Sequence, residues 1–232
     1  MIEIHKNADR GSFDHGWLQT NHSFSFAEYY NPKRMNFGAL RVLNEDVIAP
    51  GAGFPTHAHA NMEIVTIVLD GVLEHRDSSG GHGLIKPGDV QRMSAGKGVR
   101  HSEFNASKQY PCHLLQIWVD TRYPNIQPGY EQKNFPWQKS GKLVKVVSDE
   151  KNKDTLYINQ KASFYMGALD EGELTHAIED KKVAYVFLIK GNISIDGNGL
   201  KTGDAVAITK QDKMKIKILK KSEILIIEIP MK

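Results

Sequence analysis

Two pairs of side chains that can ligate a metal stand in the first half of the chain, each with one residue between its members. His57 and His59 lie in "PTHAHANME", and His101 and Glu103 lie in "GVRHSEFN". Residues two apart in a β-strand face the same side, so each pair presents both side chains to one face. If the two strands are neighbours in a barrel, three imidazoles and one carboxylate converge on its interior.

This mixed donor set determines which ions we expect. It suits a divalent first-row transition metal and leaves positions of an octahedron open, which marks a reactive rather than a structural centre. We expect Fe(II), with Ni, Co, Mn, Cu and Zn as alternatives that ligand type alone does not separate. Taken singly, each pair is also compatible with solvent-exposed histidines near turns, but the two pairs together favour a metal site.

Glu63 competes with Glu103 for the single carboxylate position. It follows His59 by four residues and has the same strand parity as both members of the histidine pair. Parity therefore cannot exclude it as a ligand. The pattern of residues leaves the choice between the two glutamates open.

The elements that must position these residues are strands. Short β-branched and aromatic runs such as "EIVTIVL", "AYVFLI" and "EILIIEI" alternate with Gly, Pro, Asn and Asp. This pattern predicts an all-β sandwich or barrel. The stretch "KQDKMKIKILKK" at 210–221 alternates lysine with apolar residues, which predicts a strand with one solvent-facing side. Apolar runs of about six residues are too short to span a bilayer, so we expect no membrane contact.

The chain divides into two similar halves. Residues 1–120 and 143–232 are predicted to be domains, and the Pro- and Gly-rich stretch 121–142 a surface linker. "PTHAHANMEIVTIVLDG" in the first half matches "LTHAIEDKKVAYVFLIKG" in the second. In the second copy His176 is kept, but Ile178 replaces the second histidine. The second domain can therefore keep a barrel but cannot assemble the same site.

Charge and composition exclude several other functions. Residues 1–120 carry 11 Lys+Arg and 13 Asp+Glu, and residues 121–232 carry 19 and 14. This basic excess is too small and too spread for nucleic-acid binding. One cysteine, Cys112, permits no internal disulfide, and the N-terminus lacks the apolar segment of a secretory signal. We expect a cytoplasmic monomer.

The remaining histidines and aromatic residues have structural interpretations. We expect solvent-exposed or hydrogen-bonded histidines, with a place at a cavity mouth as the alternative, for His75, His82 and His113. We expect core packing, with an apolar wall around a flat aromatic substrate as the alternative, for Phe24, Phe26 and Phe37. Cys112 is expected to be a small core residue.

Longer motifs carry a resemblance to a known family. "GAGFPTHAHANMEIVTIVLDG" resembles the first cupin motif, G-x5-H-x-H-x3-E. "PGDVQRMSAGKGVRHSEFN" resembles the second, but Ser94 replaces its proline and five positions, instead of three, separate Gly96 from His101. The form "RMSAGKGVRHSE" and the stretch "DHGWLQTNHSFSFAEYYNPKRMNFGALRVLNEDVI" resemble the pirin family. The resemblance covers essentially the whole chain and is closest to bacterial pirin-like proteins described as quercetin 2,3-dioxygenases.

The resemblance implies a fold and a ligand set. It implies two cupin barrels, a metal-binding N-terminal one and a degenerate C-terminal one without metal. The implied ligands are His57, His59, His101 and Glu103, so that Glu63 becomes a supporting or a structural residue. A carboxylate beside a ligating imidazole can fix its tautomer, which is a reasonable role for Glu63 if it supports the ligands.

The resemblance also implies an activity. It implies a metal-dependent dioxygenase that cleaves a flavonol such as quercetin with O2 to a depside and carbon monoxide. Glu103 is expected to act as the general base for the flavonol 3-hydroxyl if it leaves the metal or binds it weakly. The expected partners are an aromatic or enolic small molecule and O2. The alternative is a redox-sensitive metal-binding regulator that docks on a transcription factor or a metabolic enzyme.

Overall fold

Alternation of lysine with apolar residues shapes the longest strand of the molecule. In the computed structural model, which describes residues 1–231, strand β20 spans Lys213–Ile229. Met214, Ile216 and Ile218 are buried, whereas the lysines between them are exposed. The predicted strand with one solvent-facing side is therefore confirmed. Across residues 1–231 the helical segments are two 3-10 turns, η1 (Asn7–Asp9) and η2 (Trp137–Lys139).

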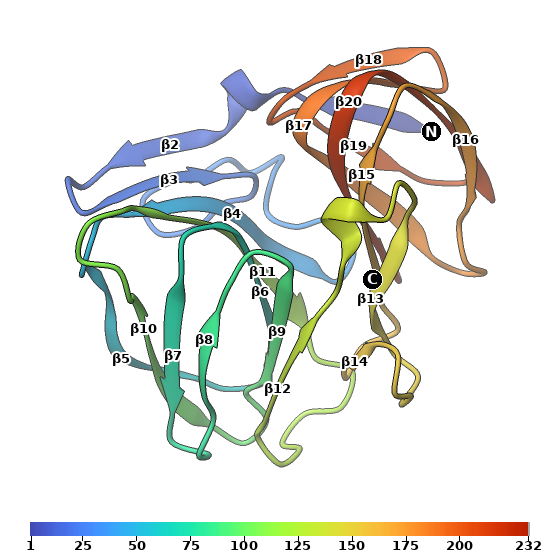
Figure 1. The fold of residues 1–232 in the computed structure, drawn as a ribbon. Coiled ribbons are helices and arrows are strands. Elements are labelled where there is room, and N and C mark those ends of the chain that lie inside the picture. The colour runs from blue at the N-terminus through green and yellow to red at the C-terminus, as the bar shows by residue number, and fades with distance from the viewer. Residues whose placement is uncertain (232) are drawn as a thin grey trace.

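The first half forms a barrel of two antiparallel sheets that face each other (Figure 1). The larger sheet has the order β12-β9-β6-β11-β4-β3-β2 and the smaller the order β5-β10-β7-β8. The strands of the larger sheet are β2 (Gly11–Asp14), β3 (Leu18–His22), β4 (Leu40–Ile48), β6 (Met62–Asp70), β9 (Asp89–Ser94), β11 (Cys112–Asp120) and β12 (Gly129–Asn134). Those of the smaller sheet are β5 (Gly53–His59), β7 (Leu73–Asp77), β8 (His82–Ile85) and β10 (Val99–Asn105).

The second half forms another barrel beside the first (Figure 1). Its strands make one nine-stranded sheet, in which β17 and β20 are long enough to pair with several neighbours each. The strands are β1 (Ile2–His5), β13 (Val144–Ser148), β14 (Leu156–Tyr157), β15 (Ser163–Leu169), β16 (Gly172–Ala177), β17 (Val183–Ile195), β18 (Asn198–Lys201), β19 (Ala205–Ile208) and β20.

Two strands pair across the predicted domain boundaries. Strand β1, from the start of the chain, pairs with β19 and so belongs to the sheet of the second barrel. Strand β12 lies inside the stretch predicted to be a linker and pairs along its length with β9 of the first barrel. The β1–β19 pairing joins the two halves by backbone hydrogen bonds as well as by side-chain packing, whereas β12 extends the larger sheet of the first barrel.

Apolar packing differs between the three interior spaces of the molecule. One large core lies between the barrels and takes side chains from both, and a second core fills the second barrel. The first barrel holds two smaller apolar clusters instead. Along β6, Ile64 belongs to one of these clusters and Val68 to the other. Thr66 lies between them, at the level where polar side chains occupy the barrel.

Residues 1–231 contain no helix with the length and hydropathy that crossing a bilayer would need.

Candidate metal centre

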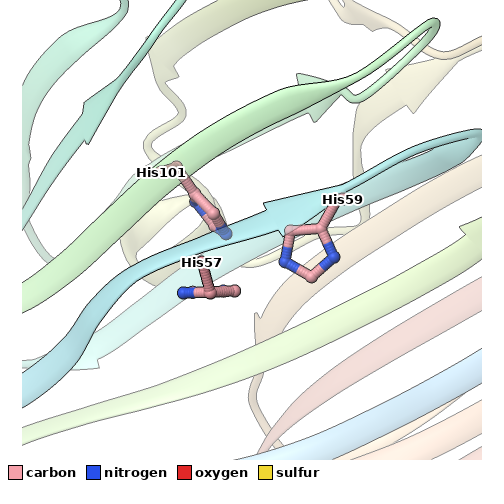
Figure 2. Close-up of side chains that lie close together, drawn as sticks. All are labelled: His57, His59 and His101. Atoms are coloured by element: carbon pink, nitrogen blue, oxygen red, sulfur yellow. The ribbon is translucent and has the colours of Figure 1, made fainter.

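Three histidines converge inside the first barrel. His57 and His59 come from β5 and His101 from β10, and the two strands pair directly, with His101 opposite His57. The ring centroids are 4.4 Å apart for His57 and His101, 4.8 Å for His57 and His59, and 4.9 Å for His59 and His101. One ring nitrogen of each lies within 4.8 Å of the others. Figure 2 shows the three rings gathered on one side of the two strands.

Glu103 follows on the same face of β10, one pleat beyond His101. Its carboxylate is not part of the three-histidine group but lies with His101 and His75 in a second group, whose ligand atoms are also within 4.8 Å of one another. Gln116 Nε2 donates to Glu103 Oε2 at 2.8 Å, and Thr66 Oγ1 donates to Glu103 Oε1 at 3.4 Å. Both donors stand on the larger sheet, so Glu103 links the two sheets across the barrel interior.

The histidine nitrogens are electrically suited to hold a cation. Burial, together with the neighbouring imidazoles, lowers the pKa of His59 to about 4 and that of His101 to about 3. Both rings are therefore neutral at neutral pH, the form that ligates metals. The Nδ1 of His57 donates to the Pro55 carbonyl at 2.8 Å, which leaves the Nε2 lone pair of this ring free to ligate.

Unpaired nitrogen atoms provide a test of whether a metal fits. Within residues 1–231, His59 Nε2 and both ring nitrogens of His101 are buried without a hydrogen-bond partner. A buried polar atom without a partner costs about 1–3 kcal/mol, so three of them in one cluster need an explanation. A bound cation supplies the missing partner to one lone pair of His59 and one of His101, whose other ring nitrogen carries a proton. The donor set of this barrel fits a divalent transition metal.

A cavity of about 330 Å³ opens beside the histidines. Its walls come from both sheets and consist of Phe26, Asn44, Asp46, Phe54, Pro55, Thr56, His57, His59, His101, Glu103, Gln116 and Trp118. Trp118 meets His59 edge to face with the ring centroids 4.8 Å apart, and Phe26 meets Trp118 in the same way at 5.3 Å. The sequence analysis predicted core packing or a place in a substrate wall for three phenylalanines. Phe26 lines this cavity, whereas Phe24 and Phe37 pack in or against the core between the barrels.

Asn44 and Asp46 are cavity residues that the sequence analysis did not single out. Both lie on β4 and are nearly fully buried, although they share strand parity with the apolar residues Leu40, Val42 and Ile48. Burial raises the pKa of Asp46 to about 7, although the Thr20 hydroxyl donates to its carboxylate. The signal that could have found them is the alternation in residues 40–48, where Asn44 and Asp46 take the positions of the apolar residues and indicate a polar interior.

Glu63 faces away from the histidines. The chain reverses at Ala60 and Asn61 between β5 and β6, and Asn61 takes a positive φ of 51°. Glu63 then points with Val65 toward the core between the barrels. Its Oε2 accepts from Ser94 Oγ at 2.8 Å and from the Asn159 backbone N–H at 3.1 Å.

These contacts give Glu63 a structural role. Burial raises the pKa of its carboxyl group, against the lowering effect of the Ser94 and Asn159 hydrogen bonds. Among the described residues its hydrogen-bond partners do not include a ligating imidazole, so the expected role of fixing a histidine tautomer is not what the structure displays. Glu63 instead ties the first barrel to the chain leading into the second.

The other singled-out histidines divide into two kinds. His82 is exposed and lies 3.3 Å from Glu74, and His113 lies 3.0 Å from Glu45, as expected for surface residues. His75 is different, because its side chain is completely buried beside His101. Cys112 is a buried core residue, as predicted, and burial raises its pKa to about 12.

The second barrel holds no comparable cluster in the part of the chain described. His176 Nε2 lies 2.6 Å from Glu228 Oε1, so this histidine is already paired. Ile178 is buried in the apolar core that fills the barrel. The fold and the site together define a bicupin in which, among residues 1–231, the metal-type clusters lie in the N-terminal barrel.

Comparison with known proteins places the chain within this class. The sequence model for Pirin matches residues 4–119, and that for a quercetinase C-terminal cupin domain matches residues 145–229. The chain belongs to the pirin family.

The sequence also matches individual relatives over nearly the full length of both chains. Quercetin 2,3-dioxygenase of Escherichia coli strain K12 is 41% identical over 99% of both chains. A putative quercetin 2,3-dioxygenase of Pseudomonas aeruginosa is 38% identical over 99% of this chain and 100% of its own. The crystal structure of the bacterial pirin YhhW from E. coli in complex with nickel(II) is 40% identical, covers 100% of both chains and superposes with a TM-score of 0.94.

Proposed function

We propose that this protein is a metal-dependent dioxygenase that cleaves a flavonol such as quercetin with O2, giving a depside and carbon monoxide. The proposed metal ligands are His57, His59, His101 and Glu103. The observation that carries the proposal is a cluster of three imidazoles on the wall of a largely apolar, aromatic cavity. The relatives named quercetin 2,3-dioxygenase and the nickel(II) complex of the E. coli pirin support it.

A divalent metal in this site supplies a Lewis acid that acidifies a hydroxyl group and a redox centre between flavonolate and O2. His59 and His101 need no deprotonation before they ligate, because their pKa values lie well below neutrality. Imidazole and carboxylate donors suit iron and nickel alike. Iron remains our prediction for the native ion, and elemental analysis of the protein from its own host tests it.

The cavity walls suit a flat polyphenol. Phe26, Phe54 and Trp118 offer apolar ring surfaces that exclude water from a bound aromatic molecule. Within residues 1–231, Trp118 Nε1 is a buried donor and Asn44 Oδ1 a buried acceptor, each without a hydrogen-bond partner. A flavonol carries both a carbonyl acceptor and hydroxyl donors, so it can pair with both atoms. These two residues are therefore proposed to orient the substrate.

Glu103 is proposed as the general base. The carboxylate oxygen of Glu103 that does not ligate the metal accepts the proton of the flavonol 3-hydroxyl, while Gln116 and Thr66 hold the carboxylate in place. Glu103 is 3% exposed, so the transferred proton is shielded from bulk water. A positioned base typically contributes about 10²–10⁴-fold to a rate.

The test is an assay of metal-loaded protein with quercetin. Apo-protein is loaded separately with Fe²⁺, Ni²⁺, Co²⁺, Mn²⁺ and Cu²⁺, and flavonol absorbance and O2 uptake are followed together. We expect equimolar loss of both with at least one metal. Glu103→Gln should lower kcat by about 10²–10⁴-fold where metal occupancy is matched. The exposed Glu173→Gln in the second barrel is the matched control and should keep full activity.

Absence of flavonol turnover with every metal tested would overturn the proposed function. Turnover that persists in Glu103→Gln at wild-type rate would leave the reaction standing and remove Glu103 as its base.

A further inference from the structure

His75 is a buried histidine that has no role in the proposed reaction. It lies on β7, and its side chain is 0% exposed. Strand β7 pairs with β10 so that His75 stands opposite Glu103 and Asp77 opposite His101. The smaller sheet therefore flanks the ligand strand β10 with histidines on both sides, from β5 and from β7.

Asp77 fixes the tautomer of His75. The Asp77 Oδ2 lies 2.9 Å from His75 Nε2, and its Oδ1 accepts from the Ser79 backbone N–H, the Ser79 hydroxyl and the Gly81 backbone N–H. A carboxylate with so many donors acts as an acceptor, so His75 Nε2 carries the proton and donates. The lone pair of His75 is consequently on Nδ1. A carboxylate on one ring nitrogen and a ligating lone pair on the other is a common arrangement around metal-binding histidines.

The Nδ1 lone pair has no protein partner. Among the described residues, His75 Nδ1 is buried without a hydrogen bond. One ligand atom from each of His75, His101 and Glu103 lies within 4.8 Å of the other two. The three residues are 0%, 2% and 3% exposed, so this group lies deeper than the group made with the half-buried His57 and His59.

Packing alone accounts for only part of this arrangement. The His75 ring stacks on Tyr130 with centroids 4.9 Å apart and an interplanar angle of 30°. That contact explains why an aromatic ring is accommodated here. It does not explain the unpartnered Nδ1 of a buried ring that lies beside the His101 imidazole and opposite Glu103.

We propose that His75 is a further metal ligand, which forms with His101 and Glu103 an inner position for a divalent transition metal. The outer position is the proposed site of His57, His59, His101 and Glu103, so the two positions share His101 and Glu103. Because a neutral imidazole has one lone pair, His101 ligates an ion in one position at a time. Because the inner residues are nearly inaccessible, an ion there has little room for substrate. An ion in the inner position is thus held away from solvent, and an ion in the outer position can contact a substrate in the cavity. This inference rests on the proposed metal centre but not on the proposed reaction.

The experiment removes the outer ligands and leaves the inner group intact. Apo-protein of the variant His57→Ala/His59→Ala is titrated with Co²⁺ and with Ni²⁺, and stoichiometry and affinity are measured by calorimetry. We expect one equivalent to bind, more weakly than in wild type. Adding His75→Ala should then lower the affinity by more than about 100-fold, beyond the 10–100-fold typical of a residue that only orients a ligand.

A matched control uses the neighbouring strand. His82 on β8 is exposed and stands opposite Arg76 of β7, so adding His82→Ala to the same double variant should leave the affinity unchanged. Far-ultraviolet circular dichroism and thermal unfolding check that every variant is folded.

A measurement on the intact protein avoids the risk of misfolding. In Co²⁺-loaded wild-type protein, proton NMR should display a hyperfine-shifted ring N–H signal from His75 Nε2, assigned by its loss in His75→Gln. Failure of the double variant to bind metal, or equal affinity with and without His75, would overturn the inner position. Neither outcome bears on flavonol cleavage, which the assay of the wild-type protein decides separately.

Discussion

The two barrels of this pirin share an architecture and differ in what fills them. The second barrel is packed with apolar side chains, among them Leu188, Ile193, Ile216 and Ile226, all almost fully buried. The first barrel places histidines, carboxylates and amides at its middle and leaves a cavity there. The second barrel folds around a mainly apolar interior that includes the buried His176–Glu228 pair. The comparison therefore indicates that folding does not require the larger polar set of the first barrel, which we attribute to its chemistry.

His57 and His176, which align between the two halves, show this difference. His57 offers a free Nε2 to the cluster, because its Nδ1 is bound to the Pro55 carbonyl. His176, its counterpart in the second half, is paired with the buried Glu228 at 2.6 Å. His176 has no second imidazole beside it, because the buried apolar Ile178 stands where the first barrel has His59.

The largest effect should come from removing the central histidine. His101→Ala deletes a side chain common to both proposed metal positions, so metal affinity should fall by more than about 100-fold, beyond the loss typical of an orienting residue. His176→Ala, in the second barrel, should leave metal content unchanged. Elemental analysis of both purified variants checks this, and equal metal content in His101→Ala and wild type would refute the site.

The filled barrel should be the more sensitive to loss of volume. Leu188→Ala removes a fully buried side chain from a close-packed interior, so the free energy of unfolding should fall by about 2–5 kcal/mol. Leu219→Ala, at a position 45% exposed on β20, should change it by less than about 0.5 kcal/mol. Urea unfolding of the two variants gives the comparison, and equal losses would mean that the second barrel is loosely packed.

The polar interior of the first barrel should give stability an unusual pH dependence. The pKa of Asp46 is raised from 3.8 to about 7 by burial, so between these values the folded state binds more protons than the unfolded one. Stability from this group is therefore lost as pH rises toward 7. At about 1.4 kcal/mol for each pKa unit, the loss reaches a few kcal/mol.

Asp46→Asn removes this titration. Relative to wild type, the variant should become more stable as pH is raised from 5 to 8, in metal-free protein unfolded with urea. Parallel pH profiles of the variant and wild type would show that Asp46 does not carry the effect.

The two candidate glutamates should separate into one structural and one metal-binding residue. Glu63→Gln places an amide where Ser94 and Asn159 both donate, so we expect a loss of about 1–3 kcal/mol in stability with metal content unchanged. Glu103→Gln should weaken metal binding instead. Metal loss in Glu63→Gln at wild-type stability would reverse the assignment.

Much of this molecule follows from its sequence. Alternation of residue types predicted an all-β chain, and the period-2 lysines of β20 are exposed as expected. Two-residue spacing placed His57 beside His59 and His101 beside Glu103 on common faces, because side-chain direction along a strand is a local property. The replacement of a histidine by Ile178 was enough to predict a second barrel without the cluster.

Tertiary structure alone decided the rest, because parity says which side chains share a face but not which face becomes the interior. The reversal at Asn61 turned Glu63 toward the second barrel, although its parity matched that of the histidines. Pairing of β7 with β10 brought His75 beside Glu103 from a distant part of the sequence. Long-range pairing also placed β1 in the second barrel, since the register between strands far apart in the chain is set by packing that no local pattern encodes.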